Sequence, residues 1–509
     1  MAILTILHTN DIHGRLDQMP RLATLIARER SLARDEGRHV LLLDAGDSSE
    51  RSAWESSITK GRANFFMLEA MGYDASTVGN GETFQWGLGA LAKLVESVHF
   101  PVLAANLFAM DSDQPPVPGL KSHAIFEIEK LKIAVLGITV DDNSAYKRFG
   151  YRCEYAAPVL RDLIPRLRAE GAQAIILLSH LGFGFDTDEE YEARIAKDPT
   201  RANNLYDRKI AKAVPGIDVI VGGHSHTLLN EMRCVGDTVI VQAGDYGKFL
   251  GRLDLEIDSD RVKAIHYQVI PCDENVPPDP TLSGMLDLVR FEAGALLKAK
   301  LGDAADDLDG DVDLKPDHES AMTDMVADAF REMCHADLGI FLSGFVARGL
   351  ARGAITRGKL MDAIPGSAHV TAGRVTGAQI LGMLDKALAR DQVMTPANIR
   401  RGRAFGLPAV SSNVLLTYNM DAPQGKRMVE CAIDGQPIDP LRSYRLATTY
   451  WTLNDSGDPD SYIFLQEGQT VEMIRIEQVL WEIMEDWIKA KSPLVLPTMG
   501  RVKEVISYQ

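Results

Sequence analysis

Short runs of leucine and β-branched residues alternate with polar turns and amphipathic stretches from residue 3 to about residue 270. Such runs predict β-strands, and the amphipathic stretches between them predict helices. Strands are expected over residues 3–11, 39–47, 74–80, 101–107, 132–142, 174–182, 218–226 and 238–245. Helical patterns cover residues 22–37, 62–72 and 159–171, and glycine ends the last two. The alternation predicts an α/β domain.

A change in composition marks the end of this first pattern. Residues 269–280 concentrate proline and acidic side chains, which predicts a boundary, and residues 281–300 have the pattern of a linking helix. A chain of 509 residues also exceeds the roughly 250–300 residues at which one hydrophobic core stops growing. We therefore expect one domain over 1–275, a linker helix within 276–304, and a second α/β or α+β domain over 305–509.

Charge and cysteine content exclude several classes of protein. The net charge of −17 argues against binding to a nucleic-acid polymer, although small anionic substrates remain possible if cations are bound. The five cysteines are odd in number and far apart, and none has a metal-ligand spacing, which favours a reducing compartment. No stretch has the pattern of a signal peptide or a membrane span. We expect a cytoplasmic protein without a membrane partner; the oligomeric state is not predicted.

Side chains of the kinds that bind metal ions follow nearly every predicted strand of the first domain. Taken singly, each has an ordinary explanation as a helix cap, a turn residue or a core histidine. Together they form a mixed oxygen and nitrogen set large enough for two divalent cations. Strand ends are also where α/β sheets place their sites. The set comprises Asp11, His13, Asp47, Asn80, His180, His224 and His226.

The segments around these residues resemble, in order and spacing, the motifs of the calcineurin-like metallophosphoesterases. The resemblance is to the 5'-nucleotidase family, which includes the bacterial UDP-sugar hydrolases. It implies an N-terminal metallophosphoesterase β-sandwich flanked by helices, followed by a smaller C-terminal α/β domain that determines substrate specificity. The matching segments are TILHTNDIHGRL, LLLDAGDSS, TVGNGE, ILLSHLG, VIVGGHSHT and VQAGDYGKFLGRLDL.

The resemblance also implies a role for each of these side chains. Asp11, His13, Asp47 and His226 would hold one divalent metal ion, and Asp47 would bridge to a second ion held by Asn80, His180 and His224. The ions could be Mn, Zn, Mg, Fe or Ca. A metal-bound hydroxide would attack the phosphorus of a nucleotide or a related small phosphate ester. The alternatives are a phosphodiesterase acting on cyclic nucleotides or nucleotide sugars, and a weakened homologue that binds metal or nucleotide.

The stretch VGNGETF, residues 78–84, departs from the family pattern. The family has Gly-Asn-His-Glu there, and its histidine contacts the phosphoryl group, whereas this chain has Gly81. Loss of a positioned acid typically slows an enzyme by about 10²–10⁴ without removing its nucleophile. Asn80 and Glu82 stay as catalytic candidates. His8 and Glu82 are candidates for a substitute donor, with a core histidine and a turn-capping carboxylate as the ordinary explanations.

The second domain resembles the family's specificity domain less sharply. In that family the domain supplies arginines for the anionic groups of the substrate and two aromatic rings that enclose its base. The matching positions here are Arg348, Arg352, Asn413, Trp451 and Asp458. The second aromatic ring is missing, because Val410 stands where the family has phenylalanine. Phe405 could replace it, or it could be an ordinary core residue.

Overall fold

The computed structural model describes most of the chain, in two compact units. The described residues are 2–50, 53–141, 146–147, 149–184, 205–258, 261–310, 315–365, 368–396, 405–449, 452–453 and 472–505. Unit 1 comprises Met1–Ala293 and unit 2 comprises Gly294–Gln509. The division falls within helix α10, Pro280–Leu297, close to the predicted linker helix. No helix among the described residues is both long and apolar enough to cross a bilayer.

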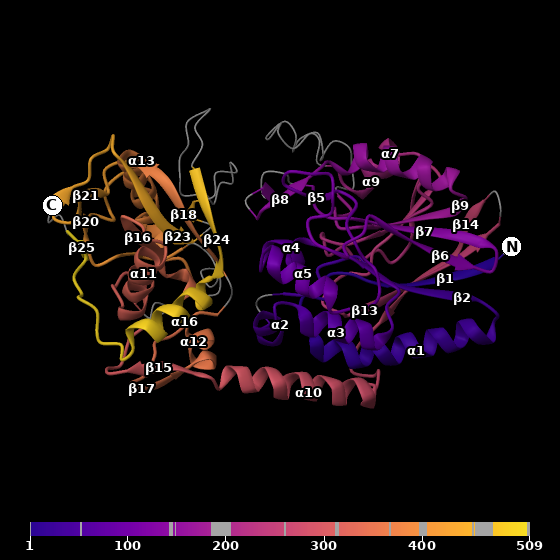
Figure 1. The fold of residues 1–509 in the computed structure, drawn as a ribbon, viewed down its shortest axis with the longest axis horizontal. Helices are drawn as coiled ribbons and strands as arrows, with labels where there is room; N and C mark the ends of the chain where they lie inside the picture. The colour runs from indigo at the N-terminus through magenta and orange to yellow at the C-terminus, as the bar shows by residue number, and fades with distance from the viewer. Residues whose placement is uncertain are drawn as a thin grey trace. The chain divides into compact units, whose positions relative to one another are not determined.

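Two six-stranded sheets form the centre of unit 1 (Figure 1). The first sheet has the order β14-β13-β1-β2-β3-β4, with bounds Val262–Pro271, Phe249–Ile257, Ala2–Thr9, His39–Asp44, Ala75–Thr77 and Val102–Leu103. The second has the order β11-β12-β10-β9-β7-β6, with bounds Arg233–Val235, Thr238–Val241, Val219–Gly222, Ala172–Ser179, Leu131–Ile138 and His123–Ile128. A third, two-stranded sheet pairs β5, Leu107–Ala109, with β8, Tyr151–Cys153.

The two large sheets of unit 1 pack face to face, with helices on both outer faces. Alternate residues of both sheets form one core cluster, which includes Leu4, Ile6, Leu41, Ile133, Ile176 and Val219. The other face of the first sheet packs against α1, Met19–Asp35, α3, Arg62–Met71, and α5, Leu88–Glu96. The other face of the second packs against α7, Ala156–Ala169, and α9, Asp207–Ala213. This confirms the predicted sandwich flanked by helices.

Parallel pairing directs several loops of unit 1 to one edge of each sheet. Strand β1 pairs parallel with β2, and β2 pairs parallel with β3. In the second sheet β9 and β10 are parallel neighbours. The carboxyl ends of parallel strands lie at the same edge, so the segments that follow these five strands gather in two neighbouring sets.

Two of the predicted strands are wrong in detail. The run 101–107 is not one strand, because the chain leaves the first sheet after β4 and pairs elsewhere as β5. Between them, the backbone N–H of Ala105 donates to Gly137 in the second sheet. The run 74–80 is a strand only over β3; Asn80 instead begins helix α4, Asn80–Phe84. Helices η1, Leu16–Gln18, and α2, Trp54–Thr59, are the remaining helices in the described part of unit 1.

Unit 2 is built on a mixed five-stranded sheet of order β19-β16-β23-β18-β24. These strands span Pro408–Val410, Leu338–Leu342, Ser443–Thr449, His369–Thr376 and Glu472–Val479. A four-stranded sheet has the order β22-β21-β20-β25, with bounds Gln436–Pro437, Met428–Ile433, Val414–Tyr418 and Val502–Glu504. A two-stranded sheet pairs β15, Lys300–Ala304, with β17, Gly353–Thr356. The helices among the described residues of unit 2 are α11, Ala321–Met333, η3, Ser343–Phe345, α12, Arg357–Ala363, α13, Gly377–Ala387, α14, Arg390–Val393, and α16, Leu480–Lys491.

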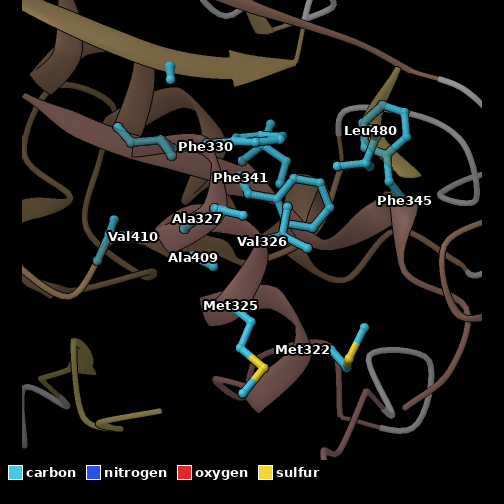
Figure 2. Packing of buried hydrophobic residues seen from close by; sticks show 14 of the residues in the cluster. Met322, Met325, Val326, Ala327, Phe330, Phe341, Phe345, Ala409, Val410 and Leu480 are labelled. Atoms are coloured by element: carbon cyan, nitrogen blue, oxygen red, sulfur yellow. The ribbon is translucent and has the colours of Figure 1, made fainter. Parts of the chain in front are cut away.

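The core of unit 2 lies between α11 and its five-stranded sheet (Figure 2). Phe330 of α11 and Phe341 of β16 meet edge to face, with ring centroids 5.7 Å apart. Phe345 continues this aromatic group beyond the end of β16, 6.1 Å from Phe341. Val410, at the family's aromatic position, is fully buried in the same core. Its side chain is therefore a packing residue of unit 2.

Candidate metal centre

The loops that follow four strands of unit 1, β1, β2, β9 and β10, bring six of the seven predicted metal ligands into two groups. The first group, which we call site A, is Asp11, His13 and His226; the second, site B, is Asp47, His180 and His224. Within each group one ligand atom of every residue lies within 4.8 Å of the others. These are the residue types and distances that a divalent cation requires.

Asp47 connects the two sites. Its Oδ2 lies 3.2 Å from Nε2 of His180 and 3.8 Å from Nε2 of His13. His180 is held in turn by the loop that follows β2, because its Nδ1 lies 2.7 Å from the carbonyl oxygen of Ala45. A single carboxylate therefore faces both sites, across the junction of the two sheets.

The backbone at the two sites is held in an uncommon conformation. Only ten non-glycine residues in the described part of the chain have positive φ, and five of these are predicted ligands. Side chains other than glycine rarely adopt this left-handed region, so such strain gathers where the surrounding structure imposes it. The five ligands, with φ between 49° and 68°, are Asp11, His13, Asp47, His224 and His226.

Asn80, the seventh predicted ligand, comes directly after Gly79, whose backbone lies close to the side chains of Asp47 and His180. A Cβ atom on Gly79 would lie 2.1 Å from Oδ1 of Asp47 and 2.6 Å from Nε2 of His180, so only glycine fits there. The amide oxygen of Asn80 is buried and accepts no hydrogen bond within the described part of the chain. A buried acceptor without a partner is costly unless a cation or water binds it, so Asn80 fits a metal site.

The carboxylates of the two sites favour positive charge beside them. Burial disfavours a charged His13 ring, but hydrogen bonds to Asp11 and Glu50 outweigh burial and raise its pKa to about 11. Burial is likewise outweighed at His180, where the charge of Asp47 raises the pKa to about 10. In the cation-free protein protons therefore supply the positive charge, and a divalent cation would displace them. The donor set fits two such cations.

Glu82 holds the ligand loops together. Its Oε2 accepts the backbone N–H groups of Asp47, at 3.1 Å, and Gly79, at 2.8 Å. Its Oε1 accepts the N–H of Ser49 at 2.9 Å and the hydroxyl of the same residue at 2.7 Å. Both oxygens are thus hydrogen-bonded to the loops, as expected of a positioning residue, and a catalytic role for Glu82 stays a prediction.

His8, the other candidate donor, lies between the sheets. Its ring stacks on Tyr267 with centroids 6.2 Å apart and covers Gly251, where a Cβ atom would lie 2.1 Å from the ring. Burial lowers the pKa of His8 to about 3. The ring is neutral at pH 7 and shares the inner face of β1 with the apolar core, so the structure gives it no role as an acid.

The predicted substrate residues of unit 2 are only partly described. Arg348 and Arg352 lie in the segment that follows η3, and both side chains are exposed. The amide of Asn413 is already bonded to the hydroxyl of Ser411, to the carbonyl of Asp337 and to the carboxylate of Asp434. Trp451 and Asp458 lie outside the described residues. The backbone oxygen of Phe405, whose ring is half-buried, bonds to the N–H of Gly344.

Sequence reasoning missed a second set of polar residues around site A. Glu50 and Asp245 each face one histidine of that site, and the ring of Tyr246 lies 5.6 Å from the rings of both His13 and His226. The only signal in the sequence was their position, within three residues of Asp47 and inside the motif VQAGDYGKFLGRLDL.

Two family profiles match the two parts of the chain. The profile described as calcineurin-like phosphoesterase matches residues 4–228, and the profile described as 5'-nucleotidase C-terminal domain matches residues 300–462. The chain belongs to the 5'-nucleotidase family of calcineurin-like phosphoesterases. Members of this family are metal-dependent phosphoester hydrolases, and sites A and B lie in the part that matches the phosphoesterase profile.

Individual proteins are similar over most of the chain. The uncharacterized metallophosphoesterase YunD of Bacillus subtilis is 26% identical over 87% of this chain and 91% of its own length. The trifunctional nucleotide phosphoesterase protein YfkN of the same organism is 27% identical over 99% of this chain, which spans 35% of YfkN. The structure of Haemophilus influenzae NAD nucleotidase has the same fold, with a TM-score of 0.62, 18% identity and 99% of each chain covered.

Proposed function

We propose that the chain hydrolyses nucleotides or related small phosphate esters with two divalent cations bound at sites A and B. The observation that carries the proposal is that two three-residue groups meet at Asp47. In this proposal Asp11, His13, Asp47 and His226 hold one cation, while Asn80, His180 and His224 join Asp47 in holding the other. The mixture of carboxylate, amide and imidazole ligands suits manganese, iron or zinc, while magnesium and calcium stay open.

Two bound cations would polarise the phosphoryl group and supply a hydroxide nucleophile at neutral pH. The residues of this chain fix the geometry. Asp47 keeps the two sites adjacent, and Glu82 fixes the loop of Asp47 to the loop of Gly79 through their backbone N–H groups. The positive φ angles of five of the ligands support loops whose conformation is fixed by their surroundings, as a preorganised site requires.

The chain differs from its family in what it offers the leaving group. Gly81 has no side chain, Glu82 is occupied by the loops, and His8 lies in the core. An alcohol leaving group needs a proton, whereas a phosphate or phenolate leaves without one. This observation favours nucleotide sugars and other phosphoanhydrides, or activated esters, over nucleoside monophosphates. The alternative explanation of Gly81 is that the chain is a weakened homologue that only binds metal or nucleotide.

In unit 2 we propose that Arg348 and Arg352 bind the anionic groups of the substrate, as exposed guanidinium groups can. Trp451 and Asp458 stay predictions for the same pocket. Asn413 contributes least, because its amide already has three partners within unit 2. The partner in this proposal is a small phosphorylated molecule, and nothing in the sequence favours a nucleic-acid polymer or a membrane.

The test is a substrate panel on the full chain, stripped of cations and reloaded with manganese. The panel contains an aryl phosphate, nucleoside monophosphates, cyclic nucleotides and nucleotide sugars. We expect turnover, fastest for the good leaving groups, and a loss of at least about a hundredfold in Asp47→Asn. The matched control is Glu129→Gln, which alters a surface carboxylate 3.4 Å from His39 and should keep full activity. Absence of turnover across the whole panel in manganese-loaded protein contradicts the proposal.

A further inference from the structure

Each of the two histidines of site A faces a carboxylate: His13 is hydrogen-bonded to Glu50, and His226 makes an ionic contact with Asp245. Nδ1 of His13 lies 3.2 Å from Oε2 of Glu50, and Nδ1 of His226 lies 3.3 Å from Oδ2 of Asp245. The two Nε2 atoms are 2.9 Å apart, and each lies 3.6 Å from Oδ1 of Asp11. A carboxylate can only accept a hydrogen bond, so Nδ1 of His13 carries the hydrogen in its bond to Glu50. The Nε2 atoms of both rings are left to face the cation position.

Site B has a different support. Nδ1 of His180 lies 2.7 Å from the carbonyl oxygen of Ala45, which carries no charge. The backbone N–H of His224 donates to Oδ1 of Asp11 at 3.0 Å. Among the described residues, no carboxylate other than those of the two sites is paired with either histidine of site B. Asp47 is shared between the sites, so its charge does not distinguish them.

We propose that Glu50 and Asp245 are positioning residues that fix His13 and His226 and make site A the tighter of the two cation sites. This rests on the proposed function, since it assumes that sites A and B bind cations. One cation would then stay resident at site A, while the cation at site B exchanges with solvent. Removing a carboxylate behind a metal-binding histidine typically lowers metal affinity by about 10–100-fold.

The two supports are not equal, because Glu50 is hydrogen-bonded to His13, whereas Asp245 makes only an ionic contact with His226. The side chains of Glu50 and Asp245 are 23% and 20% exposed, so water screens them to a similar extent. The other oxygen of Asp245 lies 2.8 Å from the ammonium group of Lys248, which neutralises part of its charge. We therefore expect substitution of Glu50 to weaken site A more than substitution of Asp245.

The experiment is a manganese titration of the full, cation-stripped chain, with free Mn²⁺ counted by its electron paramagnetic resonance signal. Wild-type protein should show two binding steps whose dissociation constants differ at least tenfold. Substitution of His226 by alanine should abolish the tight step, and substitution of His224 by alanine should abolish the weak one. The opposite assignment, or two equal steps, overturns the proposal.

The decisive variants are Glu50→Gln and Asp245→Asn, which keep an acceptor oxygen but remove its charge. Glu50→Gln should raise the dissociation constant of the tight step by about 10–100-fold, and Asp245→Asn by less, with the weak step changed by less than about threefold. Glu129→Gln, which alters a carboxylate beside the remote His39, should change neither step. If Glu50→Gln fails to fold, Asp245→Asn alone decides.

The outcomes separate the two proposals. Two manganese ions bound by wild-type protein, with an unchanged tight step in both charge variants, overturn the role of Glu50 and Asp245 and leave the proposed function standing. An equal loss at both sites also overturns that role, because it indicates a general effect of charge or folding. Failure of wild-type protein to bind manganese overturns the proposed function and this inference with it.

Discussion

The backbone N–H of Gly81 donates to Oδ1 of Asp47 over 2.5 Å, at the position where the family has its histidine. A Cβ atom on Gly81 would lie 2.9 Å from that same Oδ1 and 2.9 Å from the carbonyl oxygen of Ser49. The absence of a side chain thus permits a direct hydrogen bond to the carboxylate between the two sites. Gly81 is part of how the chain holds Asp47.

We expect Gly81→Ala to weaken cation binding, because the new methyl group would clash with the carboxylate of Asp47 and with the backbone carbonyl of Ser49. The dissociation constants for manganese should rise at both sites, since Asp47 faces both. Gly89→Ala in α5 is the matched control, because a Cβ atom there meets nothing within 4 Å. That variant should keep its manganese affinity and gain about 0.4–1 kcal/mol in stability. Unchanged binding by Gly81→Ala contradicts the close contact.

Glu82→Gln should destabilise unit 1. An amide can accept at only one end, so at least one pair of loop donors loses its acceptor, at a cost of about 2 kcal/mol or more in the free energy of unfolding. Chemical denaturation of cation-free protein measures this cost. Glu69→Gln replaces a more exposed carboxylate that also accepts a backbone N–H, from His99, and should cost less than about 1 kcal/mol. Equal losses in the two variants would falsify the positioning role of Glu82.

Arg348→Ala tests the substrate role of unit 2. We expect KM for a nucleotide or nucleotide sugar to rise about tenfold, equivalent to about 1.4 kcal/mol of lost binding. The same variant should hydrolyse a small aryl phosphate with unchanged kcat/KM and should bind manganese normally. Steady-state kinetics on both substrates separate these effects. An equal loss on both substrates indicates damage to the metal centre or the fold and contradicts the assignment.

A pH effect is expected from Asp324 in α11. Burial raises its pKa to about 9, although the guanidinium group of Arg501 lies 3.4 Å away and opposes the shift. A carboxyl whose pKa is raised on folding favours the folded state at low pH. That contribution is complete below the ordinary value near 3.8 and is lost as the pH rises towards 9.

Asp324→Asn is neutral in both states, so it should gain stability relative to wild type as the pH rises from about 4 to 9. Thermal unfolding at several pH values measures this difference. A destabilised variant at pH 8 would show that the carboxylate is ionised and paired with Arg501, which is the opposite result.

The sequence identified most of the site because its ligands follow strands whose hydrophobic pattern is strong. Asp11 and Asp47 follow neighbouring parallel strands of the first sheet, and His180 follows a strand of the second sheet. Glu50 could not be assigned to His13, because the two are 37 positions apart and only the loop conformations bring them together. The positive φ angles of the ligands could not be predicted, because only glycine adopts this left-handed conformation routinely and the ligands are not glycines.

The fold was predictable to a similar degree. Alternating strands and helices indicated the α/β sandwich, and the family resemblance supplied its arrangement. The run 101–107 read as one strand because local hydrophobicity does not show where a chain changes sheets. Asn80 read as the end of a strand because the contact that begins helix α4 is made by Glu82, which accepts the N–H of Gly79 inside a folded loop.

The central claim is that two adjacent cations share Asp47, and anomalous X-ray diffraction from manganese-loaded crystals tests it most directly. The account predicts two anomalous peaks about 3.5–4 Å apart. One peak should lie among Asp11, His13 and His226, and the other among Asp47, His180 and His224. A single peak, or two peaks away from these residues, contradicts the account.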